Sequence, residues 1–204
     1  MQTKVKSKFK RAAEAIIPSD WGEFLMVAYE TESNDYSPDI AMVHPDINIK
    51  APVTVRIHSE CLTGDLFHSQ RCDCGPQLDA SMQKINSEKG VLIYLRQEGR
   101  GIGLINKLKA YNKQDEGMDT VEANLALGFD IDYRRYEKAI AILKELGIKE
   151  IDLLTNNPDK IQAFEDSGIR INSRIPIEIQ ANKNNRKYLH TKKTSLGHFL
   201  KMDS

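Results

Sequence analysis

The chain has 204 residues, and its 29 basic and 29 acidic side chains give a formal net charge of zero. This balance excludes a strongly basic protein that attracts nucleic acid over its whole surface, so any polyanion site must be local. Hydrophobic residues make up 40% of the sequence, enough for an ordinary core, and no run reaches the roughly 20 apolar residues that cross a bilayer. We expect a cytoplasmic protein with a single domain over residues 1–204, in which residues 1–11 are a flexible leader.

The first third of the chain predicts strands, and the rest predicts alternating helices and strands. Apolar or alternating runs cover residues 23–30, 39–45 and 52–58, and their brief connections favour antiparallel pairing. Further strands are expected over 91–97 and 150–155, and helices over 76–90, 102–114, 133–147, 158–168 and 184–200. The pattern predicts a mixed α/β fold with a β-rich N-terminal part.

Three of the predicted helix ends carry specific signals. Gly147 is expected to end the helix that starts near residue 133. Asn157 is expected to cap the next helix, with Pro158 at its first position. Asp132 and Arg134 are interpreted as the N-cap region and first turn of the helix over 133–147, where capping is the simplest role for both.

All three cysteines lie in one short stretch. Cys61, Cys72 and Cys74 have the spacing C-x10-C-x-C, and an odd number of cysteines in a reducing compartment favours a metal site over disulfides. Zn²⁺ accepts cysteine sulfur in tetrahedral geometry, and three protein ligands leave one position for water. His58 and His68 are candidates for a fourth ligand that would close the site, and buried inert thiols are the alternative without metal.

An open zinc site predicts hydrolysis, because the ion lowers the pKa of bound water. Three thiolates supply much negative charge and weaken this effect, so a neighbouring acid or base is expected. Glu60 is a candidate for that role, although a solvated loop carboxylate is an alternative reading. Gly75 is expected to allow a sharp turn after the last cysteine.

Two strand-to-helix junctions are typical of phosphate sites. The stretch LRQEGRGIGLINK places Arg96 and Arg100 among three glycines, and backbone N–H groups at such a junction bind anions. A plain glycine-rich turn is the alternative. The second junction offers Thr155 and Lys160, and Arg56 adds a guanidinium suited to phosphate oxygens. Cations beside a hydrolytic metal predict a small phosphorylated substrate.

The segments HSECLTGD, SQRCDCG, RQEGRGIGL, DTVEAN, LLTNNP and YLHTKK, with PSDWGEFLMV near the start, resemble GTP cyclohydrolase II in this order. The resemblance runs from about residue 12 to 200. It implies the fold of that family and a zinc-dependent hydrolysis of GTP, in which water attacks C8 of guanine and opens the imidazole ring. Formate and pyrophosphate leave, and the product is 2,5-diamino-6-(5-phosphoribosylamino)pyrimidin-4(3H)-one, in the first step of riboflavin biosynthesis. A homodimer is also implied.

The resemblance assigns roles to individual residues. The residues that match the ligands of one Zn²⁺ per subunit are Cys61, Cys72 and Cys74. Arg134 matches a nucleophile that attacks the α-phosphorus, Asp132 matches its base, and Tyr111 matches a catalytic-site tyrosine. Mg²⁺ is expected with the triphosphate, because hard oxygen ligands suit it. The residues that match GTP contacts are Arg56, Ile57, His58, Ser59, Glu60, Gln77, Glu98, Gly99, Arg100, Thr120, Thr155 and Lys160.

Two other functions are considered beside this one. A relative that stops at the ring-opened formamide is disfavoured because both Asp132 and Arg134 are present. A non-enzymatic zinc module that binds nucleotide or RNA through the basic tail is disfavoured by the neutral charge and by the lack of an aromatic-rich RNA motif. His68 departs from the family pattern, which usually has a small residue at this position.

Overall fold

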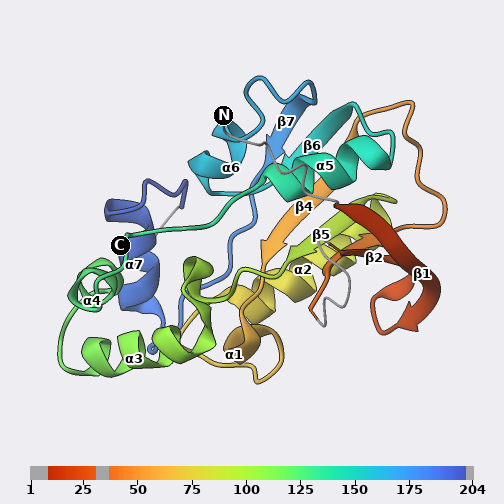
Figure 1. The fold of residues 1–204 in the computed structure, drawn as a ribbon. Coiled ribbons are helices and arrows are strands. Elements are labelled where there is room, and N and C mark those ends of the chain that lie inside the picture. Colours follow the sequence, from red (N-terminus) through yellow and green to blue (C-terminus); the bar gives the residue numbers. More distant parts are fainter. Residues whose placement is uncertain (1–8, 31–36, 201–204) are drawn as a thin grey trace, which may run out of the picture.

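The structure is a computed structural model that describes residues 9–30 and 37–200. Within these residues, seven strands form one sheet in the order β1-β2-β3-β5-β4-β6-β7 (Figure 1). The strands are β1 (Lys10–Ser19), β2 (Gly22–Glu30), β3 (Asp39–Val43), β4 (Val53–Ser59), β5 (Val91–Leu95), β6 (Glu150–Leu154) and β7 (Arg170–Ile175). The helices are α1 (Leu62–Asp65), α2 (Cys74–Ser87), α3 (Gly103–Asp115), α4 (Thr120–Ala126), α5 (Glu137–Glu145), α6 (Pro158–Gln162) and α7 (Arg186–Thr194), with a 3-10 turn η1 (Glu98–Gly101). The predicted α/β fold class is confirmed.

The sheet has an antiparallel half and a parallel half. Strands β1, β2, β3 and β5 pair antiparallel in that order, whereas β5, β4, β6 and β7 pair parallel. The predicted antiparallel pairing of 52–58 with its predecessor is therefore wrong, because β4 lies between β5 and β6. Residues 53–58 are all buried, which is typical of a central parallel strand covered on both faces.

Helices cover both faces of the sheet. On one face, Ile142 and Leu143 of α5 belong to the larger hydrophobic core, together with buried side chains from β2 to β6. On the other face, Met82 and Ile85 of α2 pack against Phe24 and neighbouring apolar residues. Each such side chain stabilises the fold by about 1.5–3 kcal/mol when fully buried. The sheet is thus the middle layer of three.

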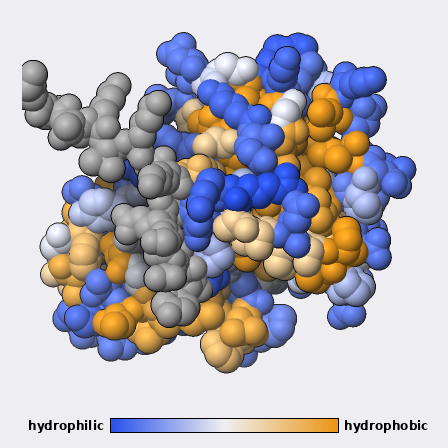
Figure 2. Space-filling model, turned by 45° about the vertical axis from the view of Figure 1, so that its right-hand side comes forward, coloured by the Kyte–Doolittle hydropathy of each residue, from blue (hydrophilic) through white to orange (hydrophobic). Residues whose placement is uncertain are grey.

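Strand β1 was not expected from the sequence. Residues 1–8 of the predicted leader lie outside the described residues, but Lys10 and Arg11 belong to β1, which pairs with β2 along its length. Residues 10–16 are all exposed. Because neither face of this stretch is buried, its sequence does not alternate between polar and apolar residues as a half-buried strand does. The side of the molecule that carries β1 comes forward in Figure 2, where hydrophilic and hydrophobic residues are intermixed. Strand β7 and helix α4 were also not predicted.

The helix predicted over 133–147 begins later than expected, at Glu137. The segment before it is irregular, because its backbone binds the loop after β5: Tyr133 N donates to Arg100 O at 3.0 Å, and Arg135 N donates to Gln97 Oε1 at 3.0 Å. The interpretation of Asp132 and Arg134 as N-cap region and first turn is therefore wrong. The expected helix end is confirmed, since Gly147 has a φ of 76° and its N–H donates to Lys144 O.

The predicted cap of α6 is confirmed, although the helix is shorter than expected. Asn157 Oδ1 accepts a hydrogen bond from Asp159 N at 3.0 Å, and Pro158 occupies the first turn. The helix ends at Gln162 rather than near residue 168. No helix in the described residues is long and apolar enough to span a membrane.

The topology predicts where a ligand binds. The parallel strands are ordered β5-β4-β6-β7, so the chain crosses from β4 to β5 on one side and later returns to β6 on the other side of β4. In open α/β sheets, ligands bind outside the carboxyl ends of the strands at such a switch point. The carboxyl half of β4, together with the loops and helix starts that follow β4, β5 and β6, contains most of the residues matched to the family motifs.

Candidate active site

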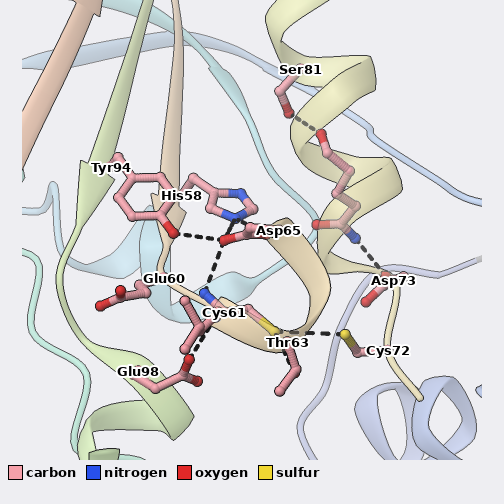
Figure 3. A network of polar contacts seen from close by, with 12 residues as sticks. His58, Glu60, Cys61, Thr63, Asp65, Cys72, Asp73, Ser81, Tyr94 and Glu98 are labelled. Atoms are coloured by element: carbon pink, nitrogen blue, oxygen red, sulfur yellow. Dashed lines mark hydrogen bonds and ion pairs between the residues drawn. The ribbon is translucent and has the colours of Figure 1, made fainter. Parts of the chain in front are cut away.

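The three cysteines converge beyond the carboxyl end of β4. Cys61 precedes helix α1, Cys72 lies in the following loop, and Cys74 is the first residue of α2. Their sulfur atoms all lie within 4.8 Å of one another, and Cys61 Sγ is 3.7 Å from Cys72 Sγ (Figure 3). Three soft donors gathered at this spacing fit a tetrahedral metal such as Zn²⁺.

Two glycines make room for this sulfur cluster. A Cβ atom on Gly64 would lie 2.9 Å from Cys72 Sγ and 3.1 Å from Cys61 Sγ. A Cβ atom on Gly75 would lie 2.4 Å from the carbonyl oxygen of Gly64. The sharp turn predicted at Gly75 is wrong, because this residue lies inside α2; its small size instead allows the helix to approach α1.

The three thiols differ in their tendency to ionise. The hydrogen bond to Cys61 raises the pKa of Cys72 to about 11, and hydrogen bonds to both other sulfurs raise the pKa of Cys74. Hydrogen bonds from Cys72 and Cys74 lower the pKa of Cys61, and the ammonium group of Lys107 lowers it further. Without a metal, the cluster therefore favours one thiolate beside two thiols. A divalent cation supplies the charge that three adjacent thiolates need.

Neither candidate for a fourth ligand joins the cluster. His58 Nε2 lies 3.0 Å from Asp65 Oδ1, and the imidazole stacks on the Tyr94 ring at a centroid distance of 5.4 Å. His68 is exposed, with a φ of 51°. In the part of the chain that the structure describes, the metal-binding group consists of cysteines alone.

Asp65 fixes the position of the first cysteine. Its Oδ2 atom accepts hydrogen bonds from Cys61 N at 2.9 Å and from the Tyr94 hydroxyl at 2.8 Å, while both carboxylate oxygens face His58 (Figure 3). Burial lowers the pKa of His58, and its Nδ1 atom is buried with no hydrogen-bond partner in the described part of the chain. The only free polar atom of the imidazole is therefore Nδ1.

Glu98 supports the same loop from the other side. Its Oε2 atom accepts a hydrogen bond from Leu62 N at 2.6 Å, and its Oε1 atom accepts from Gly99 N at 2.6 Å and from Lys107 Nζ at 2.8 Å. Lys107 Nζ also donates to Cys61 Sγ at 3.1 Å. Glu98, matched by resemblance to a GTP contact, thus holds the metal loop and the Gly-rich loop together, and Lys107 was missed by the sequence analysis.

A cavity of about 1030 Å³, counting the open space at its mouth, extends from the sulfur cluster to the loop after β6. Most of the predicted site residues line it: Arg56, His58, Ser59, Glu60, Cys61, Cys72, Cys74, Gln77, Glu98, Gly99, Arg100, Tyr111, Arg134, Thr155 and Lys160. Ile57, Thr120 and Asp132 do not. The carbonyl of Ile57 accepts a hydrogen bond from Lys160, Asp132 lies behind Arg134, and Thr120 lines a smaller neighbouring cavity.

Three cations in this cavity have no carboxylate as ion-pair partner among the described residues. Lys160 is 5% exposed, and its Nζ donates to Ile57 O at 2.7 Å. Burial lowers the pKa of Lys160 well below its ordinary value, and that of Arg56 to about 10. Arg56 Nε and Arg100 Nη1 are buried without a hydrogen-bond partner. Unsatisfied buried donors of this kind indicate a bound anion.

Asp132 and Arg134 form a close pair. Arg134 Nε donates to Asp132 Oδ1 at 2.9 Å, and Nη2 donates to Oδ2 at 2.5 Å. Burial alone would raise the pKa of Asp132, but the hydrogen bonds and charge of Arg134 hold it below its ordinary value. The carboxylate is therefore ionised. Burial alone would lower the pKa of Arg134, but Tyr136 and Asp132 hold it above its ordinary value, so the guanidinium stays charged.

Glu60 has the properties of a candidate acid or base. Its carboxylate lies 3.0 Å from Arg96 Nη1, and its side chain is 14% exposed. Burial raises the pKa of Glu60 despite this cation. Ser59, the preceding residue, accepts a hydrogen bond from Gln97 Nε2 at 2.8 Å. Burial likewise raises the pKa of Tyr111, so its hydroxyl keeps its proton.

Helix α7 and the residues after it contribute a wall that the sequence analysis missed. Lys192 Nζ donates to Asp73 Oδ1 at 2.6 Å, and Gln77 links the other oxygen of Asp73 to Arg56. His198 also lines the cavity, and burial lowers its pKa to about 3. The tail was recognised as a basic helix, but composition alone does not show which of its lysines is buried.

Comparison with known proteins gives consistent matches. The family model for GTP cyclohydrolase II matches residues 10–176. GTP cyclohydrolase-2 of Neisseria meningitidis serogroup C (strain ATCC 700532 / DSM 15464 / FAM18) is 50% identical over 189 residues, which cover 92% of this chain and 95% of that protein. Riboflavin biosynthesis protein RibBA of Bacillus subtilis (strain 168) is 52% identical over 193 residues, and the match covers 94% of this chain but 48% of that protein.

A solved structure also matches. RibBX, a two domain 3,4-dihydroxy-2-butanone 4-phosphate synthase from A. baumannii, has a TM-score of 0.42 and 18% sequence identity. The match covers 86% of this chain and 42% of that chain.

Proposed function

Because the chain belongs to the GTP cyclohydrolase II family, we propose that it catalyses the zinc-dependent hydrolysis of GTP in the first step of riboflavin biosynthesis. The guanine imidazole ring opens, formate and pyrophosphate leave, and the product is 2,5-diamino-6-(5-phosphoribosylamino)pyrimidin-4(3H)-one. Relatives named for GTP cyclohydrolase-2 and for riboflavin biosynthesis, each about half identical over most of this chain, support the assignment.

One observation carries the proposal most directly. The sulfur cluster of Cys61, Cys72 and Cys74 shares a single cavity with Lys160 and Arg100, two cations that no carboxylate pairs with among the described residues. A hydrolytic metal at one end and an anion site at the other match a substrate that combines a base with a chain of phosphates. GTP has both parts.

In the ring-opening step, a bound Zn²⁺ would supply an acidified water for attack on C8 of guanine. The protein groups beside the sulfurs orient the base and move protons. Glu60 is the proposed proton carrier, because its raised pKa lets the carboxyl group hold a proton near neutral pH more readily than an ordinary glutamate. His58 Nδ1 and the protonated Tyr111 hydroxyl are proposed to contact the substrate, because both residues line the cavity.

The triphosphate is proposed to bind at the other end of the cavity. Arg56 and Arg100 offer unsatisfied guanidinium nitrogens, and Lys160 offers an ammonium group without a counterion among the described residues. Thr155 and Gln77 lie in the same wall. Mg²⁺ would bind to the phosphate oxygens, because it prefers hard oxygen ligands and usually enters sites with its substrate.

Pyrophosphate release is proposed to use the pair of Arg134 and Asp132. Arg134 attacks the α-phosphorus through a guanidinium nitrogen, so a P–N bond forms while the P–O bond to pyrophosphate breaks. Asp132 takes the proton lost by the guanidinium, for which its ionised carboxylate at 2.5–3.0 Å is suited. Water then cleaves the P–N bond and restores the arginine.

Organisation and location complete the proposal. We infer one catalytic domain over residues 1–204, assembled as a homodimer that acts in the cytoplasm. A measurement of molar mass by light scattering during size-exclusion chromatography tests the assembly; a mass of one subunit at micromolar protein would contradict it.

Mass spectrometry of the products tests the reaction. Purified protein with Zn²⁺, Mg²⁺ and GTP is expected to release formate and pyrophosphate and to form the diaminopyrimidine. A ring-opened product that retains the formyl group would show that the chain stops at the formamide. Unchanged GTP with intact metal would favour a nucleotide-binding module and reject the proposed activity. Protein stripped of metal by a chelator is the control, and returning Zn²⁺ should restore turnover.

A further inference from the structure

We propose that Lys107 is a positioning residue that tunes the sulfur cluster, by donating a charge-assisted hydrogen bond to Cys61 and so limiting the electron density that this sulfur gives to a bound metal. The inference rests on the proposed function, because it assumes that the cluster holds a catalytic ion. It concerns a residue from α3, an element outside the loop that supplies the ligands.

The position of Lys107 allows its ammonium group to contact the sulfur of Cys61. Its Nζ atom lies 3.1 Å from Cys61 Sγ and 2.8 Å from Glu98 Oε1, and the side chain is 10% exposed. Glu98 already accepts hydrogen bonds from two backbone N–H groups, so it does not require a lysine to be satisfied. Burying an ammonium group costs free energy, and its position against sulfur as well as carboxylate indicates a role at the cluster.

The chemistry of the cluster explains why a cation is needed there. A divalent ion bound by three thiolates forms a complex with a net charge of −1. This negative charge makes the ion less able to acidify water than an ion bound by three neutral ligands. A hydrogen bond from an ammonium group withdraws charge from one sulfur and partly offsets this excess. Groups that contact metal ligands in this way commonly change activity or metal affinity by about 10- to 100-fold when they are replaced.

The test uses Lys107→Met, which keeps the length and apolar stem of the side chain, and Lys107→Arg, which keeps its charge and donors. Each protein is loaded with Co²⁺ in place of Zn²⁺, and the sulfur-to-cobalt charge-transfer band is recorded. Without the ammonium group Cys61 becomes a stronger donor, so the band of K107M should move to lower energy than that of the wild type. The K107R band should stay near the wild-type position.

Turnover of the zinc proteins is measured in parallel. The kcat of K107M should fall about 10- to 100-fold with KM for GTP nearly unchanged. Lys109→Met is the matched control, because Lys109 lies on the exposed face of the same helix; its band and kcat should equal those of the wild type.

Four outcomes would overturn the inference: a K107M band at the wild-type energy, a K107R band shifted as far as that of K107M, a kcat of K107M equal to that of the wild type, or a K107M protein that no longer binds one metal per chain. The last would mean that Lys107 assembles the site rather than tunes it. A wild-type protein that binds no Co²⁺ at its cysteines or leaves GTP unchanged would instead reject the proposed function.

Discussion

The two halves of the sheet differ in how many polar side chains they bury without a partner. In the antiparallel half, β1 exposes seven consecutive positions, and the buried side chains of β2 are apolar or aromatic, such as Phe24 and Val27. The buried Asp39 of β3 is paired with Lys138. In the parallel half, the buried positions of β4 include Arg56 and His58, and helix α6, which follows β6, buries Lys160. Burying such groups costs free energy unless partners or ligands compensate.

This difference separates a framework from a site. The antiparallel strands contribute to the core, whereas the region around the carboxyl ends of β4, β5 and β6 holds buried polar atoms with no partner among the described residues, such as Arg56 Nε and His58 Nδ1. The candidate functional residues are therefore concentrated where buried polar atoms lack hydrogen-bond partners within the described protein. Substitutions in the two halves should separate these two contributions.

Replacing a ligand in the parallel half should have the largest effect. Cys72→Ser removes one of the three soft donors and is expected to reduce formate release from GTP to the background rate, with loss of the metal. Elemental analysis and a formate assay check both results, and Ser69→Ala in the same loop is the control. Full turnover by C72S would rule out the sulfur-bound metal as the catalytic ion.

Lys160→Met should weaken binding of the triphosphate. Loss of one charge-assisted hydrogen bond is expected to raise KM for GTP roughly 10- to 100-fold. Binding of inorganic tripolyphosphate, measured by calorimetry, should weaken in parallel. Lys149→Met, a variant at an exposed lysine before β6, is the control. Equal tripolyphosphate affinity in wild type and K160M would show that the phosphates bind elsewhere.

The same variant should gain stability at neutral pH. The pKa of Lys160 is held well below 10.5 in the folded protein, so between the lowered value and 10.5 the unfolded chain binds more protons. The free energy of unfolding of the wild type therefore rises with pH between the lowered pKa and 10.5. At pH values below the lowered pKa, the buried ammonium group destabilises the folded protein fully. Urea unfolding should show K160M more stable than wild type at neutral pH, with the difference shrinking as pH rises. A constant difference would contradict the depressed pKa.

Gly64→Ala should damage the cluster without removing a ligand. The added methyl group would lie about 3 Å from two sulfurs, and overpacking of this kind costs about 1–3 kcal/mol. We expect lower metal affinity and a lower melting temperature, measured by competition with a chromophoric chelator and by calorimetry. Leu66→Ala, at a position that is 60% exposed in the same loop, should leave both unchanged.

The antiparallel edge should tolerate change. Ile16→Ala in β1, where the side chain is 50% exposed, is expected to change the free energy of unfolding by less than about 0.5 kcal/mol and to leave kcat unchanged. Ile142→Ala in the core should cost about 2–5 kcal/mol. Urea denaturation of both variants compares their free energies of unfolding. A large loss of stability in I16A would mean that β1 is buried in the native assembly.

Much of the fold could be predicted because local signals agree with the tertiary structure. Asn157 and Pro158 mark the start of α6, and Gly147 marks the end of α5. The failures come from non-local causes. The pairing of β4 depends on the crossover through α2, and the start of α5 at Glu137 depends on hydrogen bonds to the loop after β5.

The site was predictable where its chemistry appears in a short motif. The spacing of Cys61, Cys72 and Cys74 indicated a metal cluster, and the cluster forms. Lys107 and Lys192 were not found, because a lysine in an amphipathic helix is normally solvated and nothing local shows that it is buried. The one available signal was the spacing of four between Lys107 and Tyr111, which places both on one face of α3.

The way the sulfurs are divided between elements has a mechanical consequence. Cys61 follows the central strand β4, whereas Cys74 begins the helix that covers one face of the sheet. An ion bound between them links the strand to the helix. Loss of the ion would loosen the segment between strand and helix, while the distant strands keep their hydrogen bonds. Amide hydrogens of residues 61–74 would then exchange with solvent much faster than those of β2, which makes the segment a local opening unit rather than a site of global unfolding.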